Sequence, residues 1–327
     1  MARLVTLGIL SDIHYAGAAE QAHGDDYSYR GIPNPFLRAL ARTYYRFIWT
    51  RDALRQNHLL DRFLDQSASF DYVIANGDYT CDCAMVGVSD NAACQSASEC
   101  LGKLRERFGS RLLANYGDHE LGKISLFGDR GGMRLASWHR AQRELGLQPC
   151  WKLELGRYVL IGVVSSLVGL PVFEADTLPA ERAEWERLRE QHLAQLREVF
   201  SALRSDQRIL LFCHDPTALP FLWRETAVRS RLPQLEQTVI GHLHSQLVFW
   251  KSKLLAGMPP IGFLGHSLKR FSTALNEARH WRPFHVRLCP SLAGIELLKQ
   301  GGYCTITLDP EAQQPSCFQV HRLKSDG

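Results

Sequence analysis

The chain has 327 residues, of which 45% are apolar and 22% charged, the composition of a globular protein with a sizeable core. The formal net charge of +4 is too small to indicate a nucleic-acid partner, and we expect none. The longest uncharged run, Tyr158 to Phe173, is shorter than the ~20 residues of a spanning helix and contains glycine and proline, so we expect no transmembrane segment.

Nine cysteines are an odd number with no repeating spacing, which argues against a disulfide framework and favours free thiols. The pair Cys81-x-Cys83 has no second pair of matching spacing, so we interpret these two as packing or surface thiols. The apolar stretch before Asp12 is too short for a signal peptide. These features predict a cytoplasmic protein, and peripheral association with a membrane is considered below.

Short runs rich in valine, isoleucine and leucine alternate with longer amphipathic patterns, as in an α/β protein. The expected strands in this part of the chain are Leu4–Leu10, Tyr72–Ala75, Arg111–Asn115, Tyr158–Val164, Ile209–Cys213 and Thr238–Ile240. The expected helical segments are Pro35–Ser67, Ala92–Phe108, Arg134–Leu145 and Pro179–Leu203. The strands read as buried on both faces, which favours a parallel sheet covered by helices.

After His244 the pattern predicts strands without long helices. These are Gln246–Trp250, Ile261–Leu264, Phe284–Leu288, Tyr303–Leu308 and Cys317–Leu323. The expected fold class is therefore α/β, a two-sheet β-sandwich flanked by helices, with a helical insertion after the first strand. We find no repeat or flexible linker, so we expect one domain over residues 1–327 with the insertion or cap at 31–68.

Five short polar fragments stand out against this background, and all but one directly follow an apolar run. They are Asp12-Ile13-His14, Gly77-Asp78, Gly117-Asp118-His119-Glu120, Cys213-His214 and Gly241-His242-Leu243-His244. Side chains that follow strands gather at one end of a sheet, where α/β folds place their chemistry. Carboxylates and imidazoles together are ligands for divalent transition metals such as manganese, zinc or iron.

The spacing within the fragments supports a metal site. Alternate residues at a strand end point to the same side, so Asp12 and His14 can hold one ion. Asp78 has two oxygens and can bridge two cations ~3.5–4 Å apart, and Gly77 lets the backbone approach closely. The same alternation places the two imidazoles of the fifth fragment on one side. The histidine of the fourth fragment adds one more ring nitrogen. The residues that supply these nitrogens are His214, His242 and His244.

The five fragments in this order resemble the calcineurin-like metallophosphoesterase superfamily, whose pattern is Asp-x-His, Gly-Asp, Gly-Asn-His-Glu/Asp, His and Gly-His-x-His. The resemblance extends from Leu4 to about His244 and implies two divalent metal ions, with manganese the first choice and iron, zinc or magnesium as alternatives. It implies that one ion is held by Asp12, His14, Asp78 and His244. The other would be held by Asp78, Asp118, His214 and His242.

The resemblance also implies catalytic roles in the third fragment. His119 would neutralise charge on the phosphoryl group or protonate the leaving oxygen, and Glu120 would orient it. Asp118 departs from the family pattern, which has asparagine there. Beside two dications we expect this carboxyl to be ionised, and we predict tighter metal binding and a less electrophilic metal pair.

A basic, aromatic segment from Asn34 to Trp49 lies outside the motifs. Three arginines recur every fourth residue and so line one helical face, namely Arg38, Arg42 and Arg46. Phe36, Leu40 and Tyr44 contribute to a broad apolar side. Such a helix can lie on an anionic membrane or clasp a lipid, and its arginines can hold substrate phosphates. The alternative is a surface helix packed on its own domain, with its arginines in solvent.

These features predict a dimetal phosphohydrolase in which hydroxide attacks phosphorus. The basic helix resembles that of enzymes acting on lipid-linked nucleotide pyrophosphates, so the favoured substrate is UDP-2,3-diacylglucosamine of lipid A synthesis, giving UMP and the lipid sugar phosphate. His119 is a departure, because those enzymes commonly carry arginine there. The alternatives are a cyclic-nucleotide or general phosphodiesterase acting on a phosphorylated small molecule, and a non-catalytic scaffold on the same fold.

Overall fold

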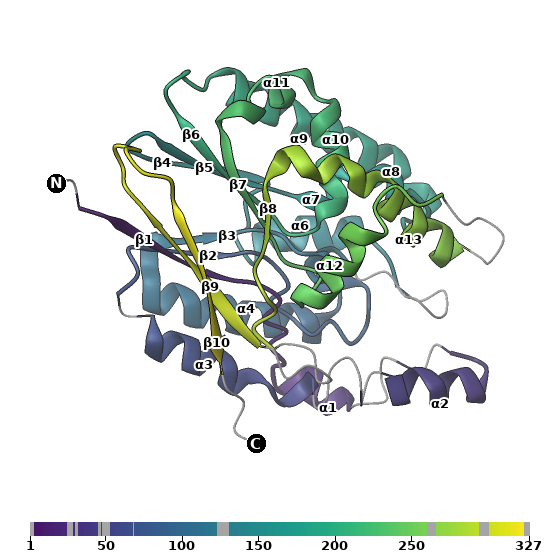
Figure 1. Cartoon of the computed structure of the whole chain (residues 1–327). Coiled ribbons are helices and arrows are strands. Elements are labelled where there is room, and N and C mark those ends of the chain that lie inside the picture. Colours follow the sequence, from purple (N-terminus) through teal and green to yellow (C-terminus); the bar gives the residue numbers. More distant parts are fainter. Residues whose placement is uncertain are drawn as a thin grey trace.

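The structure is a computed structural model that describes residues 3–24, 29, 32–44, 47, 53–67, 69–122, 131–259, 266–293 and 301–323. Two five-stranded sheets lie face to face within this part of the chain, with helices on both outer sides (Figure 1). The expected fold class, a two-sheet sandwich flanked by helices, is confirmed. Among the described helices, none combines the length and the apolar character needed to cross a bilayer.

The first sheet has the strand order β10-β9-β1-β2-β3. Its strands are β1 (Val5–Leu10), β2 (Tyr72–Ala75), β3 (Leu112–Ala114), β9 (Gly301–Leu308) and β10 (Cys317–Leu323). The strands β1, β2 and β3 are parallel, whereas β9 runs antiparallel to both β1 and β10. The carboxyl ends of β1, β2 and β3 therefore lie at one edge of the sheet.

The second sheet has the order β4-β5-β6-β7-β8. Its strands are β4 (Cys150–Leu155), β5 (Tyr158–Val163), β6 (Arg208–Cys213), β7 (Leu235–Ile240) and β8 (Val286–Leu288). All neighbours are parallel except β4, which is antiparallel to β5. The sequence prediction missed β4, although its alternation of apolar and charged residues is typical of a half-exposed strand.

The core between the two sheets is apolar and fully enclosed. Leu7 and Ile9 of β1 pack there with Leu210, Phe212 and Val239 of the second sheet. The outer face of the first sheet is covered by α3 (Asn57–Gln66), α4 (Asn91–Phe108) and α6 (Leu135–Arg143). The outer face of the second is covered by α7 (Ser165–Val168), α9 (Arg182–Ser201) and α10 (Leu219–Arg224). Strands buried on both faces explain the continuous apolar runs in the sequence.

Further helices connect these layers. The α-helices are α1 (Ala18–His23), α2 (Pro35–Tyr44), α5 (Asp118–Leu121), α8 (Leu170–Phe173), α11 (Thr226–Arg229), α12 (Gln246–Leu254) and α13 (His266–Glu277). The 3₁₀ helices are η3 (Ala53–Arg55), η4 (Gly87–Ser89), η5 (Gly109–Arg111), η6 (Glu174–Asp176), η7 (Pro179–Glu181), η8 (Pro216–Ala218), η9 (Leu232–Gln234) and η10 (Ala278–Phe284).

The expectation of strands without long helices after His244 is wrong, because the 12-residue helix α13 lies there together with α12 and η10. The segment predicted as the strand Gln246–Trp250 begins α12 instead. Its N-cap is Ser245, whose side chain accepts the N–H of Val248 at 3.3 Å, and this bond stabilises the first helical turn. Phe249 then stacks against Trp281, with ring centroids 6.4 Å apart. The predicted strand Ile261–Leu264 lies outside the described residues.

The segment between β1 and β2 contains helices of two kinds. Helix α3 buries Leu59, Leu60 and Phe63 in the core of the first sheet. Helix α2 buries only Ala41 among its residues and lies at the margin of the molecule (Figure 1). The single helical pattern expected over Pro35–Ser67 is therefore divided, and only α3 contributes a full face to the core.

Candidate metal centre

The polar fragments meet at one end of the sandwich, where strands of both sheets finish. Two of them follow β1 and β2, a third forms α5 after β3, and the last two follow β6 and β7. The structure brings all seven predicted ligands and the neighbouring imidazole into one connected group. Its members are Asp12, His14, Asp78, Asp118, His119, His214, His242 and His244.

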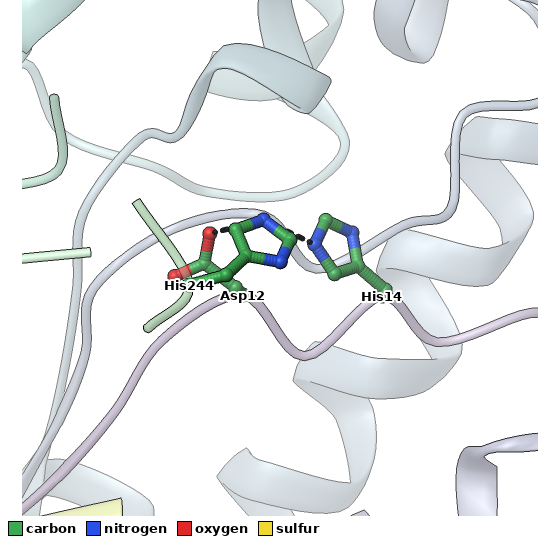
Figure 2. Close-up of side chains that lie close together, drawn as sticks. All are labelled: Asp12, His14 and His244. Carbon is green, nitrogen blue, oxygen red and sulfur yellow. Dashed lines mark hydrogen bonds and ion pairs between the residues drawn. The ribbon is translucent and has the colours of Figure 1, made fainter. Parts of the chain in front are cut away.

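One part of this group comprises Asp12, His14 and His244 (Figure 2). The Nε2 atom of His244 lies 3.2 Å from Oδ1 of Asp12 and 3.4 Å from Nε2 of His14. All three side chains are buried. One ligand atom from each lies within 4.8 Å of the other two, a spacing at which a single cation can contact all three.

A second part comprises Asp118, His214 and His242. Oδ1 of Asp118 lies 3.0 Å from Nε2 of His214 and 3.0 Å from Nδ1 of His242. Asp78 joins the two parts, because its Oδ2 atom is 3.2 Å from Nε2 of His214 and its carboxylate also groups with Asp12. The side chains of Asp118 and His242 are 15% and 36% exposed, so the site opens to solvent on this side.

The alternation predicted from the sequence requires an extended backbone at the ligands. The backbone that carries these side chains is not extended. Positive φ angles between 51° and 60° occur at five predicted ligands, namely Asp12, His14, Asp78, His242 and His244. This left-handed conformation is uncommon for residues other than glycine, and it recurs at functional sites. The pairs converge because the chain turns at each ligand, rather than through the alternation of a strand.

Glycines of the motifs allow the loops to approach one another. A Cβ atom on Gly117 would lie 2.1 Å from Oδ1 of Asp78, and one on Gly241 would lie 1.9 Å from Oγ of Ser11. Gly77 has a φ of 97°, and a Cβ there would lie 2.6 Å from Cα of Gly117. The close approach expected at Gly77 is thus present, and two further motif glycines share the role.

Glu120 does not orient His119 in the way that the resemblance implied. Its carboxylate accepts the backbone N–H groups of Asp78 at 3.0 Å, Tyr79 at 2.7 Å and Gly117 at 2.8 Å. Glu120 is completely buried, and burial raises the pKa of its carboxyl while these three hydrogen bonds oppose that rise. Glu120 is therefore a positioning residue for the loop that presents Asp78.

The imidazole of His119 is held by a backbone carbonyl instead. Its Nδ1 lies 3.0 Å from the carbonyl oxygen of Cys81, which can only accept, so Nδ1 carries a proton. Its Nε2 lies 3.8 Å from Oδ2 of Asp78. The same logic applies to His214, whose Nδ1 donates to the carbonyl of Asn76 at 2.6 Å and whose Nε2 faces the carboxylates. Such bonds select the tautomer and orientation of metal-binding imidazoles.

The charges of the group are strongly coupled. Burial and the neighbouring Asp118 raise the pKa of Asp78 to about 8. Burial would also raise the pKa of Asp12, but attraction to His244 and His214 holds it below its usual range. Burial opposes the charged form of His242, yet the carboxylates of Asp215 and Asp118 raise its pKa to about 10. Buried acids and imidazoles that share protons in this way are groups from which a divalent cation can displace protons.

Asp118, the residue that departs from the family pattern, shows the opposite shift to Asp78. Burial would raise its pKa, but His242 and His214 lower it well below the usual range of a carboxyl. The expectation that this side chain is ionised therefore agrees with its surroundings. The charged carboxylate faces the two imidazoles of the second part of the group.

The predicted phosphate-binding arginines are not part of this group as the structure describes it. The guanidinium of Arg38 donates to the carbonyl of Ile32 at 2.7 and 3.0 Å, closing the start of α2. Arg42 is exposed on the same helix, and Arg46 lies outside the described residues. Among the described apolar residues of this segment Ala41 is buried, whereas Phe36 is 76% exposed, Leu40 57% and Phe47 64%.

Sequence reasoning missed three supporting residues. The carbonyl groups of Asn76 and Cys81 hold the imidazoles of His214 and His119. Asp215 is buried and raises the pKa of His242. Two of the three stand directly beside a motif in the sequence, which is the only signal that could have indicated them, because a backbone carbonyl leaves no mark in residue identity.

Comparisons with known proteins add to this picture. No protein-family model matches the chain, and no curated protein matches it by sequence. Among solved structures, a dimetal phosphatase from Danio rerio is similar with a TM-score of 0.54 and 12% identity, over 98% of this chain and 97% of that one. A purple acid phosphatase from yellow lupin (Lupinus luteus) seeds gives a TM-score of 0.35 and 12% identity, over 75% and 38% of the two chains. The chain therefore shares the fold of the first of these proteins over 98% of its length.

Proposed function

We propose that this chain is a dimetal phosphohydrolase. The observation that carries the proposal is the pair of three-residue groups, Asp12 with His14 and His244 on one side and Asp118 with His214 and His242 on the other, with Asp78 between them. The shared fold with a dimetal phosphatase supports it. The non-catalytic alternative is less well supported, because a scaffold has no need of buried, charged and tautomerically ordered side chains at such cost to stability.

The donor set fits two divalent cations. A mixture of three carboxylates and four imidazoles suits manganese, iron or zinc, and manganese is the ion we would test first. Asp12, His14 and His244 would hold one ion and Asp118, His214 and His242 the other, with the carboxylate of Asp78 lying between them. The proton on Nδ1 of His214 leaves its Nε2 lone pair directed at the site.

Two divalent ions supply, when bound, an acidified water and positive charge for the oxygens of a phosphate. The chain itself contributes the rest. His119 is only 4% exposed and lies next to His14; as the imidazolium, with a proton on each ring nitrogen, it can donate the Nε2 proton to the leaving oxygen or neutralise charge on the phosphoryl group. Cys81 keeps that imidazole in place through its carbonyl, and Glu120 holds the loop of Asp78.

The first test is hydrolysis of bis-p-nitrophenyl phosphate with manganese, together with the metal content of the purified protein. We expect His214→Ala to bind less metal and to have a turnover at least 100-fold lower than wild type. We expect His119→Ala to keep its metal but lose about 10²–10⁴-fold in turnover, the usual contribution of a general acid. The exposed His139→Ala is the matched control and should match wild type. Full activity in His214→Ala, or no turnover with manganese, iron, zinc or magnesium, would overturn the proposal.

We further propose that the substrate is a lipid-linked nucleotide pyrophosphate, with UDP-2,3-diacylglucosamine as the specific candidate. The exposed apolar residues of α2 support this, because Phe36 and Leu40 can shelter acyl chains while Arg42 faces an anionic surface. Release of UMP in detergent micelles with manganese tests it, beside bis-p-nitrophenyl phosphate and a cyclic nucleotide. Cleavage of the small esters alone would leave the dimetal chemistry and favour the phosphodiesterase alternative.

Contact of α2 with a membrane surface belongs to the same proposal. We expect wild type to pellet with vesicles containing phosphatidylglycerol, and Phe36→Asp/Leu40→Asp to remain in the supernatant. Both residues are exposed, so the change should leave the fold intact. Leu4→Asp/Val320→Asp makes the same charge change at two other exposed apolar positions and serves as control. Equal pelleting of all three proteins would count against a membrane role for α2.

A further inference from the structure

A second cavity lies away from the metal centre. Its volume is about 480 Å³, and it is bounded by the end of α12, by η10 and by the edge strand β8. Glu236, near the start of β7, also borders it. His242 follows the opposite end of β7, six residues further along. At about 3.3 Å per residue this separates the cavity from the metal centre by roughly 20 Å.

The charge around this cavity is unbalanced. Four cationic side chains border it, and none of them has an ion pair with a described carboxylate. They are Lys253, Arg279, Arg282 and Arg287. The one bordering carboxylate, Glu236, is already engaged by Arg208 at 3.0 Å and by the hydroxyl of Tyr158 at 3.0 Å. We call this cavity the basic pocket.

Two of these cations, Lys253 and Arg287, also affect one another. Burial and the nearby Arg287 lower the pKa of Lys253, the direction expected when positive groups lie together. The Nζ atom of Lys253 also lies 4.1 Å from the ring centroid of Phe249, which keeps the ammonium close to the pocket wall. Like charges this close repel one another, and a bound anion would relieve the repulsion.

The remaining wall of the basic pocket is formed by three aliphatic residues, by Trp281 and by His285. Ala256, Ala278 and Val286 line it together with Trp281. Trp281 is 6% exposed, and its indole Nε1 has no hydrogen-bond acceptor among the described residues. A buried N–H without an acceptor is uncommon in proteins.

We propose that the basic pocket binds a phosphorylated anion. Arginine guanidinium groups match phosphate oxygens with paired N–H donors, and the volume is that of a site for a small molecule. The site uses none of the residues assigned to the metal centre, so it goes beyond the proposed hydrolase function and stands or falls independently of it. The anion has two sources, a free phosphorylated compound or the headgroup of a lipid, since Trp250 and Leu254 on α12 are 60% and 68% exposed nearby.

Equilibrium dialysis of the manganese-loaded full chain with radiolabelled orthophosphate tests the proposal. We expect Arg282→Glu/Arg287→Glu to lose one bound phosphate per chain, with affinity at that site at least tenfold weaker. Arg107→Glu/Arg322→Glu changes the net charge equally at two other exposed positions and should bind like wild type. Equal phosphate binding by the two double variants would overturn the proposal.

Two additions keep the test decisive. Thermal unfolding shows whether each variant is folded. If Arg282→Glu/Arg287→Glu is not folded, the milder double variant Arg282→Gln/Arg287→Gln takes its place. Full phosphate binding by that milder variant would also overturn the proposal. Pelleting with phosphatidylcholine vesicles that contain phosphatidic acid separates the sources. Loss of pelleting in Arg282→Glu/Arg287→Glu assigns the site to a lipid headgroup, and unchanged pelleting with lost orthophosphate binding assigns it to a free phosphorylated compound.

Discussion

The carboxylate of Glu120 accepts the backbone N–H of Asp78 at 3.0 Å, across the gap between two loops that follow neighbouring strands. It also accepts the N–H groups of Tyr79 and Gly117. One buried side chain therefore ties the Gly-Asp loop to the start of α5, and the position of the bridging carboxylate depends on it.

Replacing this carboxylate tests that dependence. Glu120→Gln removes the charge and places an amide N–H against a backbone N–H, so at least one buried donor loses its acceptor. We expect the free energy of unfolding to fall by about 2–4 kcal/mol, measured by urea denaturation, because hydrogen bonds to a buried charge are strong. Manganese affinity should weaken in the same variant. Glu106→Gln on the exposed face of α4 is the control, and equal stability of the two variants would contradict the positioning role.

A second prediction concerns the carboxylate that stands in place of the family's asparagine. In Asp118→Asn the ionised group beside His214 and His242 becomes neutral. We expect manganese affinity to fall at least tenfold, seen by calorimetric titration, and turnover at saturating manganese to rise as the metal pair becomes more electrophilic. Asp61→Asn, at an exposed position of α3, is the control. Unchanged affinity and turnover would show that the extra charge has no influence on the site.

A third prediction follows from the close approach of the loops that carry Asp78 and Gly117. Gly117→Ala would place a methyl group 2.1 Å from Oδ1 of Asp78, so the loops must separate and the metal centre must open. We expect loss of metal binding and activity. Gly102→Ala is a sharp control, because a methyl group there meets nothing within 4 Å and lies within α4. That variant should gain about 0.5–1 kcal/mol of stability and keep full activity.

A fourth prediction concerns a buried histidine away from the site. The Nε2 atom of His192 accepts the N–H of Val164 at 3.2 Å, and burial lowers the pKa of its imidazole to about 4. Between pH 6.5 and pH 4 the unfolded chain binds a proton that the folded chain does not. This group therefore removes stability as the pH falls through that window, by about 3 kcal/mol in total.

The variant His192→Gln keeps an acceptor for Val164 without a titrating group. Urea denaturation at pH 7 and pH 4 should show a smaller acid loss of stability in His192→Gln than in wild type. Groups at the metal centre titrate in both proteins, so they cancel in the difference. The exposed His139→Gln should behave like wild type. Parallel pH curves for His192→Gln and wild type would show that the buried imidazole does not govern this window.

The elements that local patterns specify could be predicted from the sequence. Tyr72–Ala75 is predicted with the bounds of β2, and the predicted ligand fragments do meet at strand ends. Prediction failed where tertiary packing decides. The run Gln246–Trp250 is apolar and short enough for a strand, and only the cap at Ser245 and the contact of Phe249 with Trp281 make it a helix.

The same limit applies within the site. Residue types indicated metal ligands, but the role of Glu120 depends on a loop that lies about forty residues earlier in the chain. The carbonyl of Cys81 has no signature in residue identity, and the left-handed backbone at Asp12 and His14 contradicts the simple alternation argument. The metal-binding chemistry could thus be predicted from the residue types of the motifs and their order in the chain. The contacts that hold the ligands in place could not, because they join residues that are close only in the folded structure.

The antiparallel pairing of β1 with β9 joins Val5 to Leu308, close to the two ends of the chain. During synthesis the first strand leaves the ribosome long before its neighbour on that side exists. The central strand of the sheet must then wait with one edge unpaired until residues 301–308 have emerged, and such edges invite association between nascent chains. Truncation before residue 301 should therefore yield a chain that chaperones retain, rather than a smaller folded protein.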